Sequence, residues 1–125
     1  MAIFSKTFDT HSEHAANAVK SGDLNVLATP ALAAFMENTA FEFASQQLDE
    51  AHTTVGSELG LQHLAASAIG ETVTIVIIAL KEEGHKYDFR LEAYVHDRLV
   101  AKACHTRVRV NRQRFMQRLN SNDKK

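Results

Sequence analysis

The chain has 125 residues, of which 45% are hydrophobic and 23% are charged, and its formal net charge is −1. This length fits one domain that buries its own core, and the near-neutral charge gives no reason to expect nucleic acid or an anionic membrane as a partner. The single cysteine, Cys104, excludes an intrachain disulfide and favours a reducing compartment. Residues 1–6 lack the apolar core of a signal peptide, and the longest apolar run, residues 73–80, is far shorter than the roughly 20 residues that cross a bilayer. We therefore expect a cytoplasmic protein.

The clearest element in the first half of the chain is a long helix. A strand over residues 2–10 and a short polar helix or turn over residues 12–18 precede it. We expect Thr29 to be the N-cap, Pro30 to take the first helical position, and the helix to end near Leu48. Its apolar side chains are spread around the helix rather than along one stripe, which is typical of a buried helix.

Four strands and a short basic helix follow. The strands are predicted over residues 53–64, 72–81, 86–96 and 99–110, and the helix over residues 111–119. The first contains glycines that indicate a bulge or a close backbone approach, the second reads as a central strand covered on both faces, and the third alternates cleanly between apolar and polar residues. Short connections, with a tight turn at residues 96–98, predict an antiparallel meander.

Covering a helix that is apolar on most faces requires a strongly curved sheet and a second subunit. The prediction is an α+β hotdog fold, in which an antiparallel five-stranded sheet wraps round one long buried helix and pairs edge to edge into a dimer. One such domain is expected over residues 1–125, with a partly frayed basic tail over residues 115–125.

Glu37 is the first candidate for chemistry. It is the one charged residue in a helix row that otherwise holds Ala33, Phe41, Ala44 and Leu48. A carboxylate in such a row either lies at the helix rim or at a dimer interface, or faces a cleft and acts as a base or nucleophile. The residues alone leave both interpretations open.

His63 and Thr29 are the next candidates. His63 ends the glycine-bearing strand, although one of seven histidines is a weak signal by itself. Without a second His or Cys at ligand spacing, we predict no metal site. A role as helix N-cap is enough to account for Thr29, but the start of a helix also offers free N–H groups to an acyl oxygen. Thr29 and Glu37 are roughly 12 Å apart along the helix axis, so a shared site needs a spanning substrate or a second subunit.

Basic residues gather near the end of the chain. Arg107 and Arg109 share one face of the last strand, and Arg112 and Arg114 follow. The cluster is either a solvated charged surface or a clamp for the phosphates of an anionic ligand.

Four stretches carry a resemblance to a known family: residues 27–37, 54–57 and 63–75, and residues 105–107 together with 114–115. In these stretches the sequence resembles the fluoroacetyl-CoA thioesterase family of hotdog enzymes, in order and spacing over about residues 24–115. The most specific piece begins at His63 and reads His-x-Ala-Ala-Ser/Thr-x-x-Gly-x-Thr-Val-Thr.

The resemblance implies a catalytic set of Thr29, Glu37 and His63. In it Glu37 is the base or nucleophile, His63 is its proton-transfer partner, and Thr29 is a positioning or nucleophilic hydroxyl. The N–H group of Gly56 would hold the thioester carbonyl. Arg107, Arg109 and Arg114 would meet the phosphates of coenzyme A at the surface.

The implied activity is hydrolysis of a short- or medium-chain acyl-CoA by a homodimer or tetramer, with CoA as part of the substrate and no separate cofactor. Residues 20–25 contain no aromatic residue where the fluoroacetyl-specific enzyme has an aromatic lid, so another acyl group is expected. The alternative is a non-catalytic hotdog protein that binds acyl-CoA as a sensor or assembly partner. A hotdog dehydratase or hydratase is a third reading, but those enzymes use an Asp–His pair, and no Asp stands suitably before His63.

Overall fold

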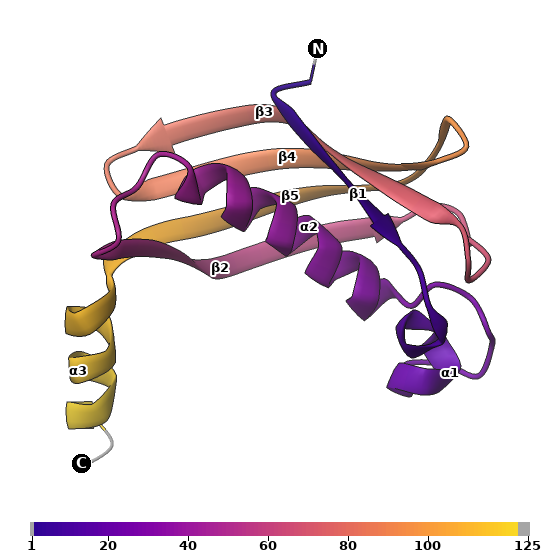
Figure 1. Cartoon of the computed structure of the whole chain (residues 1–125), viewed down its shortest axis with the longest axis horizontal. Helices are drawn as coiled ribbons and strands as arrows, with labels where there is room; N and C mark the ends of the chain where they lie inside the picture. Colours follow the sequence, from indigo (N-terminus) through magenta and orange to yellow (C-terminus); the bar gives the residue numbers. More distant parts are fainter. Residues whose placement is uncertain (1, 123–125) are drawn as a thin grey trace.

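The computed structural model describes residues 2–122, which form one curved antiparallel sheet around a long helix (Figure 1). The elements are β1 (Phe4–Asp9), a 3-10 turn (Ser12–His14), α1 (Ala16–Val19), α2 (Thr29–Ser45), β2 (His52–His63), β3 (Thr72–Glu83), β4 (Lys86–Val95), β5 (Arg98–Asn111) and α3 (Arg112–Asn122). The α+β class and the sheet of five antiparallel strands on one long helix are therefore confirmed.

The strand order is β1-β3-β4-β5-β2. Strands β3, β4 and β5 form the predicted meander, and left-handed backbone at His96 and Asp97 makes the tight turn between β4 and β5. The prediction of a simple meander is wrong at β2, which pairs with β5 at the far edge instead of with β3. The connection from β2 to β3, residues 64–71, is no tight turn but a loop long enough to cross the sheet.

The core lies between α2 and the concave face of the sheet. The alternation predicted for β4 is confirmed, since Tyr87, Phe89, Leu91, Ala93 and Val95 are all buried against the helix side. In β3 only every second residue is fully buried, and Val76 and Ile78 remain half-exposed. The expectation that both faces of β3 are covered is therefore wrong for a single chain, because no element among residues 2–122 packs on the outer face.

Helix α2 is buried only on its sheet side. Leu32, Phe35, Met36, Thr39, Ala40 and Ala44 are buried, whereas Ala34 is exposed and Glu37 and Phe41 are half-buried. The N-cap is Ala28, in extended backbone, and Thr29 is already the first helical residue. The prediction of Thr29 as N-cap is thus wrong, because its hydroxyl bonds to another element.

Helix α3 projects away from the sheet and continues to Asn122 (Figure 1). It ends three residues later than predicted, so residues 115–122 of the expected frayed tail are helical, and residues 123–125 lie outside the described part of the chain. None of the helices within residues 2–122 is long and apolar enough to cross a membrane.

Candidate functional site

A bulge in β2 brings two distant residues of that strand onto the face that meets α2. Gly56 and His63 are an odd number of positions apart, so a regular strand would point them to opposite faces. The pairing with β5 shifts between Gly56 and Glu58, which leaves Ser57 as an extra residue. As a result the backbone of Gly56 and the ring of His63 both face the helix, as the predicted bulge and close approach require.

The first pair of candidates meets at the start of α2. The Oγ1 atom of Thr29 lies 2.8 Å from Nδ1 of His63, although 34 positions separate the two residues. The Nε2 atom of His63 is buried and has no hydrogen-bond partner among residues 2–122. A cavity of about 290 Å³ lies beside the pair and is lined largely by small apolar side chains, including Ala28 and Ala65.

Burial lowers the pKa of His63 below its ordinary value, while a backbone contact with Ala65 opposes this effect. The ring is therefore neutral at neutral pH and can accept a proton. A hydroxyl that bonds to one ring nitrogen fixes the orientation of the ring. The Thr29–His63 pair is suited to moving a proton to or from a group in the adjacent cavity.

The lowered pKa of His63 predicts a pH dependence of stability. The unfolded chain binds a proton with a pKa near 6.5, and the folded state does so only at lower pH. The contribution of neutral His63 is therefore present above about pH 6.5 and is lost as the pH falls through the folded pKa. Thermal denaturation between about pH 7 and pH 5 should show a smaller fall in melting temperature for His63→Gln than for the unmodified chain. Equal falls in melting temperature for the two proteins would contradict the attribution of this pH dependence to His63.

The second group of candidates surrounds Glu37, two helical turns after Thr29. A Cβ atom on Gly56 would lie 3.3 Å from Oε2 of Glu37, 3.3 Å from Cε1 of His105 and 3.4 Å from Nη1 of Arg107. The carboxylate of Glu37 thus lies close to Gly56 of β2, where a larger side chain would crowd Glu37, His105 and Arg107. No described hydrogen bond joins Glu37 to Thr29 or His63, so the chain forms two separate clusters.

Arg107 is buried, with 7% of its surface exposed. Its Nε donates to Oγ1 of Thr54 at 2.8 Å, and its Nη2 donates to the carbonyl of Thr54 at 3.0 Å. Its guanidinium also lies 5.7 Å from the ring centre of Phe41 on α2. The expectation that Arg107 meets phosphates at the surface is therefore wrong for this chain: the face it shares with His105 is the one that packs against α2.

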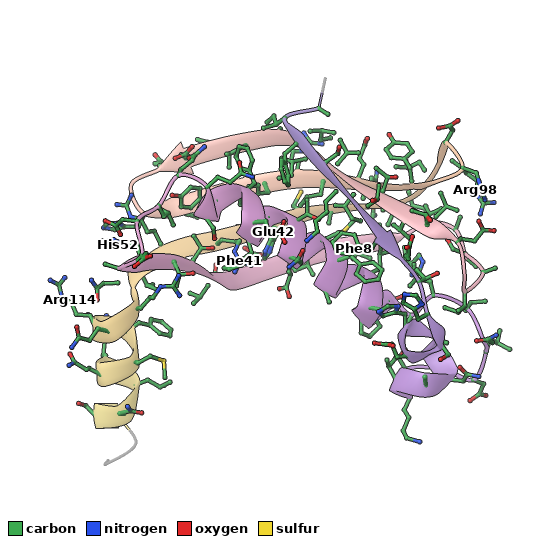
Figure 2. The ribbon with its side chains drawn as sticks, viewed as in Figure 1. Phe8, Phe41, Glu42, His52, Arg98 and Arg114 are labelled. Atoms are coloured by element: carbon green, nitrogen blue, oxygen red, sulfur yellow. The ribbon has the colours of Figure 1, made fainter. Side chains whose placement is uncertain are left out.

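Arg109 and Arg114 lie apart from Arg107, in a surface groove of about 560 Å³ where β5 meets α3. The groove also contains Arg118, and Nη2 of Arg109 donates to Nδ1 of His85 at 2.8 Å. Figure 2 shows Arg114 and His52, another lining residue, at the same end of the molecule. Asp49 also lines the groove, but it bonds to His52, and no carboxylate within residues 2–122 forms an ion pair with these arginines, so the groove is suited to an anion.

His105 and Thr54 are two residues of the cluster around Arg107 that were not predicted from the sequence as functional. One signal was available for His105, since it stands two positions before Arg107 on a strand and therefore shares its face. Nothing in the pattern around Thr54 indicates that it supplies two acceptors to a guanidinium. No three His, Cys, Asp or Glu side chains in the described part of the chain converge as ligands for a metal ion.

The sequence model of one family, described as fluoroacetyl-CoA-specific thioesterase (FlK), matches residues 10–113. Among solved structures, a mutant of FlK in complex with fluoroacetate and CoA aligns with a TM-score of 0.88 and 19% identity, over 95% of this chain and 98% of that chain. None of the curated proteins compared with the sequence matches it significantly.

Two further structures align over nearly the whole chain. A thioesterase superfamily member from Thermus thermophilus has a TM-score of 0.83 and 22% identity, over 96% of this chain and 91% of that one. A hot-dog-like protein from Thermanaerovibrio acidaminovorans has a TM-score of 0.81 and 20% identity, over 95% and 88%. At these identities the likeness establishes the fold, and it confirms the predicted hotdog architecture.

Proposed function

Because the chain belongs to the fluoroacetyl-CoA-specific thioesterase family, we propose that it hydrolyses the thioester of a short- or medium-chain acyl-CoA to the free acid and CoA. The observation that carries the proposal is the closeness of the Glu37 carboxylate to Gly56, where a Cβ would lie 3.3 Å from Oε2. A carboxylate and a backbone N–H group close to one another suit attack on a carbonyl held between them.

In this reaction the C–S bond breaks and water supplies the new C–O bond and two protons, one to each product. Glu37 removes a proton from the attacking water, or attacks the carbonyl itself to form an anhydride that water then cleaves. The N–H group of Gly56 stabilises the negative charge on the carbonyl oxygen. His63, neutral at rest and held by Thr29, first accepts the proton that water loses in the reaction and then passes it to the departing thiolate of CoA, which returns the ring to its neutral form.

The distance between the two clusters favours a site that a second copy of the chain completes. Strand β2 is at the edge of the sheet and has one unpaired side. Two β2 strands paired antiparallel around a two-fold axis place the first half of one strand beside the second half of the other. The Glu37–Gly56 cluster of one copy then approaches the Thr29–His63 pair of its partner.

The activity is tested by incubating the protein with CoA esters of acetate through dodecanoate and following free thiol release. Cleavage of at least one ester supports the proposal. Binding of several esters without any cleavage would favour the rival function, a sensor or assembly partner that binds acyl-CoA.

The test for the shared site is to mix Glu37→Gln with His63→Ala, two variants that should each be inactive. Subunit exchange should restore about a quarter of the unmodified activity if each site takes one residue from each copy, and no activity if each site lies within one chain.

The groove at the β5–α3 junction is proposed to hold the phosphates of CoA. Arg109→Glu combined with Arg114→Glu should raise KM about tenfold or more and change kcat little, because the reacting atoms lie elsewhere. Added salt should raise the KM of the unmodified protein in the same direction. Arg90→Glu, an exposed arginine on the outer face of the sheet, is the matched control and should keep the original KM. A normal KM in the double variant would exclude this groove as the phosphate site.

A further inference from the structure

Arg107 is a buried cation that no carboxylate within residues 2–122 contacts at ion-pair distance. Three of its N–H groups are used, by the two oxygens of Thr54 and by Nε2 of His105 at 3.1 Å. A buried charge without a contacting counter-ion is costly. Perturbed charged groups of this kind gather at functional sites.

The negative charge next to Arg107 is Glu37, and the two groups approach the same side of Gly56. Oε2 of Glu37 and Nη1 of Arg107 both lie within 3.4 Å of the point that a Cβ on Gly56 would occupy. The two groups are therefore within about 7 Å of each other, close enough for the two opposite charges to attract one another at this half-buried site.

His105 is fixed in one tautomer by its two neighbours. Its Nδ1 lies 2.7 Å from the carbonyl oxygen of Glu58, which only accepts hydrogen bonds, so Nδ1 carries the proton. Its Nε2 must then be unprotonated, and it accepts from Nη1 of Arg107, which only donates. The bulge after Gly56 precedes Glu58 directly and sets the position of its carbonyl. The same irregularity that opens the space beside Glu37 therefore also orients the ring.

Resting on the proposed thioesterase function, we propose that His105 is a positioning residue: its unprotonated Nε2 holds the guanidinium of Arg107 beside the carboxylate of Glu37. It acts on the reaction only through Arg107. Without this acceptor, only the two bonds to Thr54 hold the guanidinium, which can then tilt as a unit, so that the positive charge beside Glu37 is less firmly fixed.

The surroundings of His105 keep the ring neutral. Its side chain is 2% exposed, and burial is the main cause that lowers its pKa; Arg107 acts in the same direction, while the Glu58 carbonyl and Glu37 oppose it. Strand β4 contributes the uncharged ring of Phe89. A protonated His105 would lose its acceptor and place two like charges side by side, so the arrangement requires the neutral form.

The test compares His105→Phe with His105→Gln. Glutamine keeps an oxygen that can accept from Arg107, whereas phenylalanine keeps the ring shape without an acceptor, and both lose the bond to Glu58. His105→Phe should lower kcat on the order of 10- to 100-fold with KM nearly unchanged. His105→Gln should keep most of kcat. Equal losses of kcat in the two variants would show a merely structural role.

A double variant shows whether His105 acts through Arg107. If it does, His105→Phe should cause little further loss of kcat in an Arg107→Met background, because the interaction is already absent. If kcat of the double variant instead falls by the product of the two single-variant losses, the two residues act independently and the inference is wrong.

A readout without substrate separates this inference from the proposed function. In ¹⁵N-labelled protein at neutral pH, the ring of His105 should show the Nδ1-protonated tautomer, and the Nε2 resonance should move in Arg107→Met. If the unmodified protein cleaves no acyl-CoA, the proposed function fails while this spectrum still reports on the His105–Arg107 bond. An Nε2-protonated ring would overturn the positioning role whatever the activity.

Discussion

Glu37→Gln should lower kcat for acyl-CoA cleavage by about 10²- to 10⁴-fold, the range expected when a general base is removed. Glutamine is nearly the same size as glutamate but neither accepts a proton at neutral pH nor attacks a carbonyl. Because Glu37 is half-buried and forms no ion pair at contact distance with any residue from 2 to 122, the fold should tolerate the change. Thiol release and thermal denaturation, measured on the same preparations, check both expectations.

The matched control is Glu42→Gln, on the same helix. Glu42 is also half-buried, but its carboxylate bonds to Lys6 of β1 and takes no part in the Gly56 contact (its position on α2 is labelled in Figure 2). Glu42→Gln should keep kcat while weakening the link between α2 and β1. If Glu37→Gln keeps full activity, or if both variants lose activity equally, the proposed role of Glu37 is wrong.

One further measurement separates the two roles left open for Glu37. In a single turnover in ¹⁸O-labelled water, a general base sends the label only to the released acid. A nucleophile forms an anhydride, and attack of water on its glutamyl carbon leaves the label on the peptide that contains Glu37. Mass spectrometry of that peptide distinguishes the two.

Local pattern was sufficient for the elements but not for their long-range arrangement. The alternation of residues 86–96 identified β4 and its buried face, and Pro30 located the start of α2 within a residue. The position of β2 beyond β5 depends on pairing between Thr54 and Arg109 and their neighbours, which no local pattern contains. Thr29 illustrates the same limit, since the capping rule ignores a histidine 34 positions away that binds its hydroxyl.

Only part of the candidate site could be predicted, for the same reason. The alternation of a strand predicts that the side chains of Arg107 and Arg109 lie on the same face of β5. It does not predict that α2 covers this face at Arg107 or that the face is open to solvent closer to α3. The burial of Arg107 follows from acceptors on β2 and β5, brought together only by folding. The roles of Thr29, Glu37, His63 and Gly56 stay predictions, although the structure brings them together as two pairs.

Gly56→Val is expected to lower activity strongly for a steric reason. A Cβ at this position meets Glu37, His105 and Arg107 at 3.3–3.4 Å, and the two further methyl groups of valine enter the space proposed for the thioester carbonyl. We expect kcat/KM to fall by about 100-fold or more and the free energy of unfolding to fall by about 1–3 kcal/mol, as for overpacked sites. Gly56→Ala should have a smaller effect on both quantities.

Gly60→Val is the control, on the same strand and with the same change of side chain. A Cβ on Gly60 meets nothing within 4 Å, so valine there should leave kcat/KM unchanged and the free energy of unfolding within about 0.5 kcal/mol. Neither glycine has a positive φ, so the comparison isolates the space around the Cβ from backbone strain. Similar kinetics in the two valine variants would mean that the space between Gly56 and Glu37 is not where the substrate reacts. A loss confined to Gly56→Val would locate the reaction there, because the two changes differ only in what the new side chain meets.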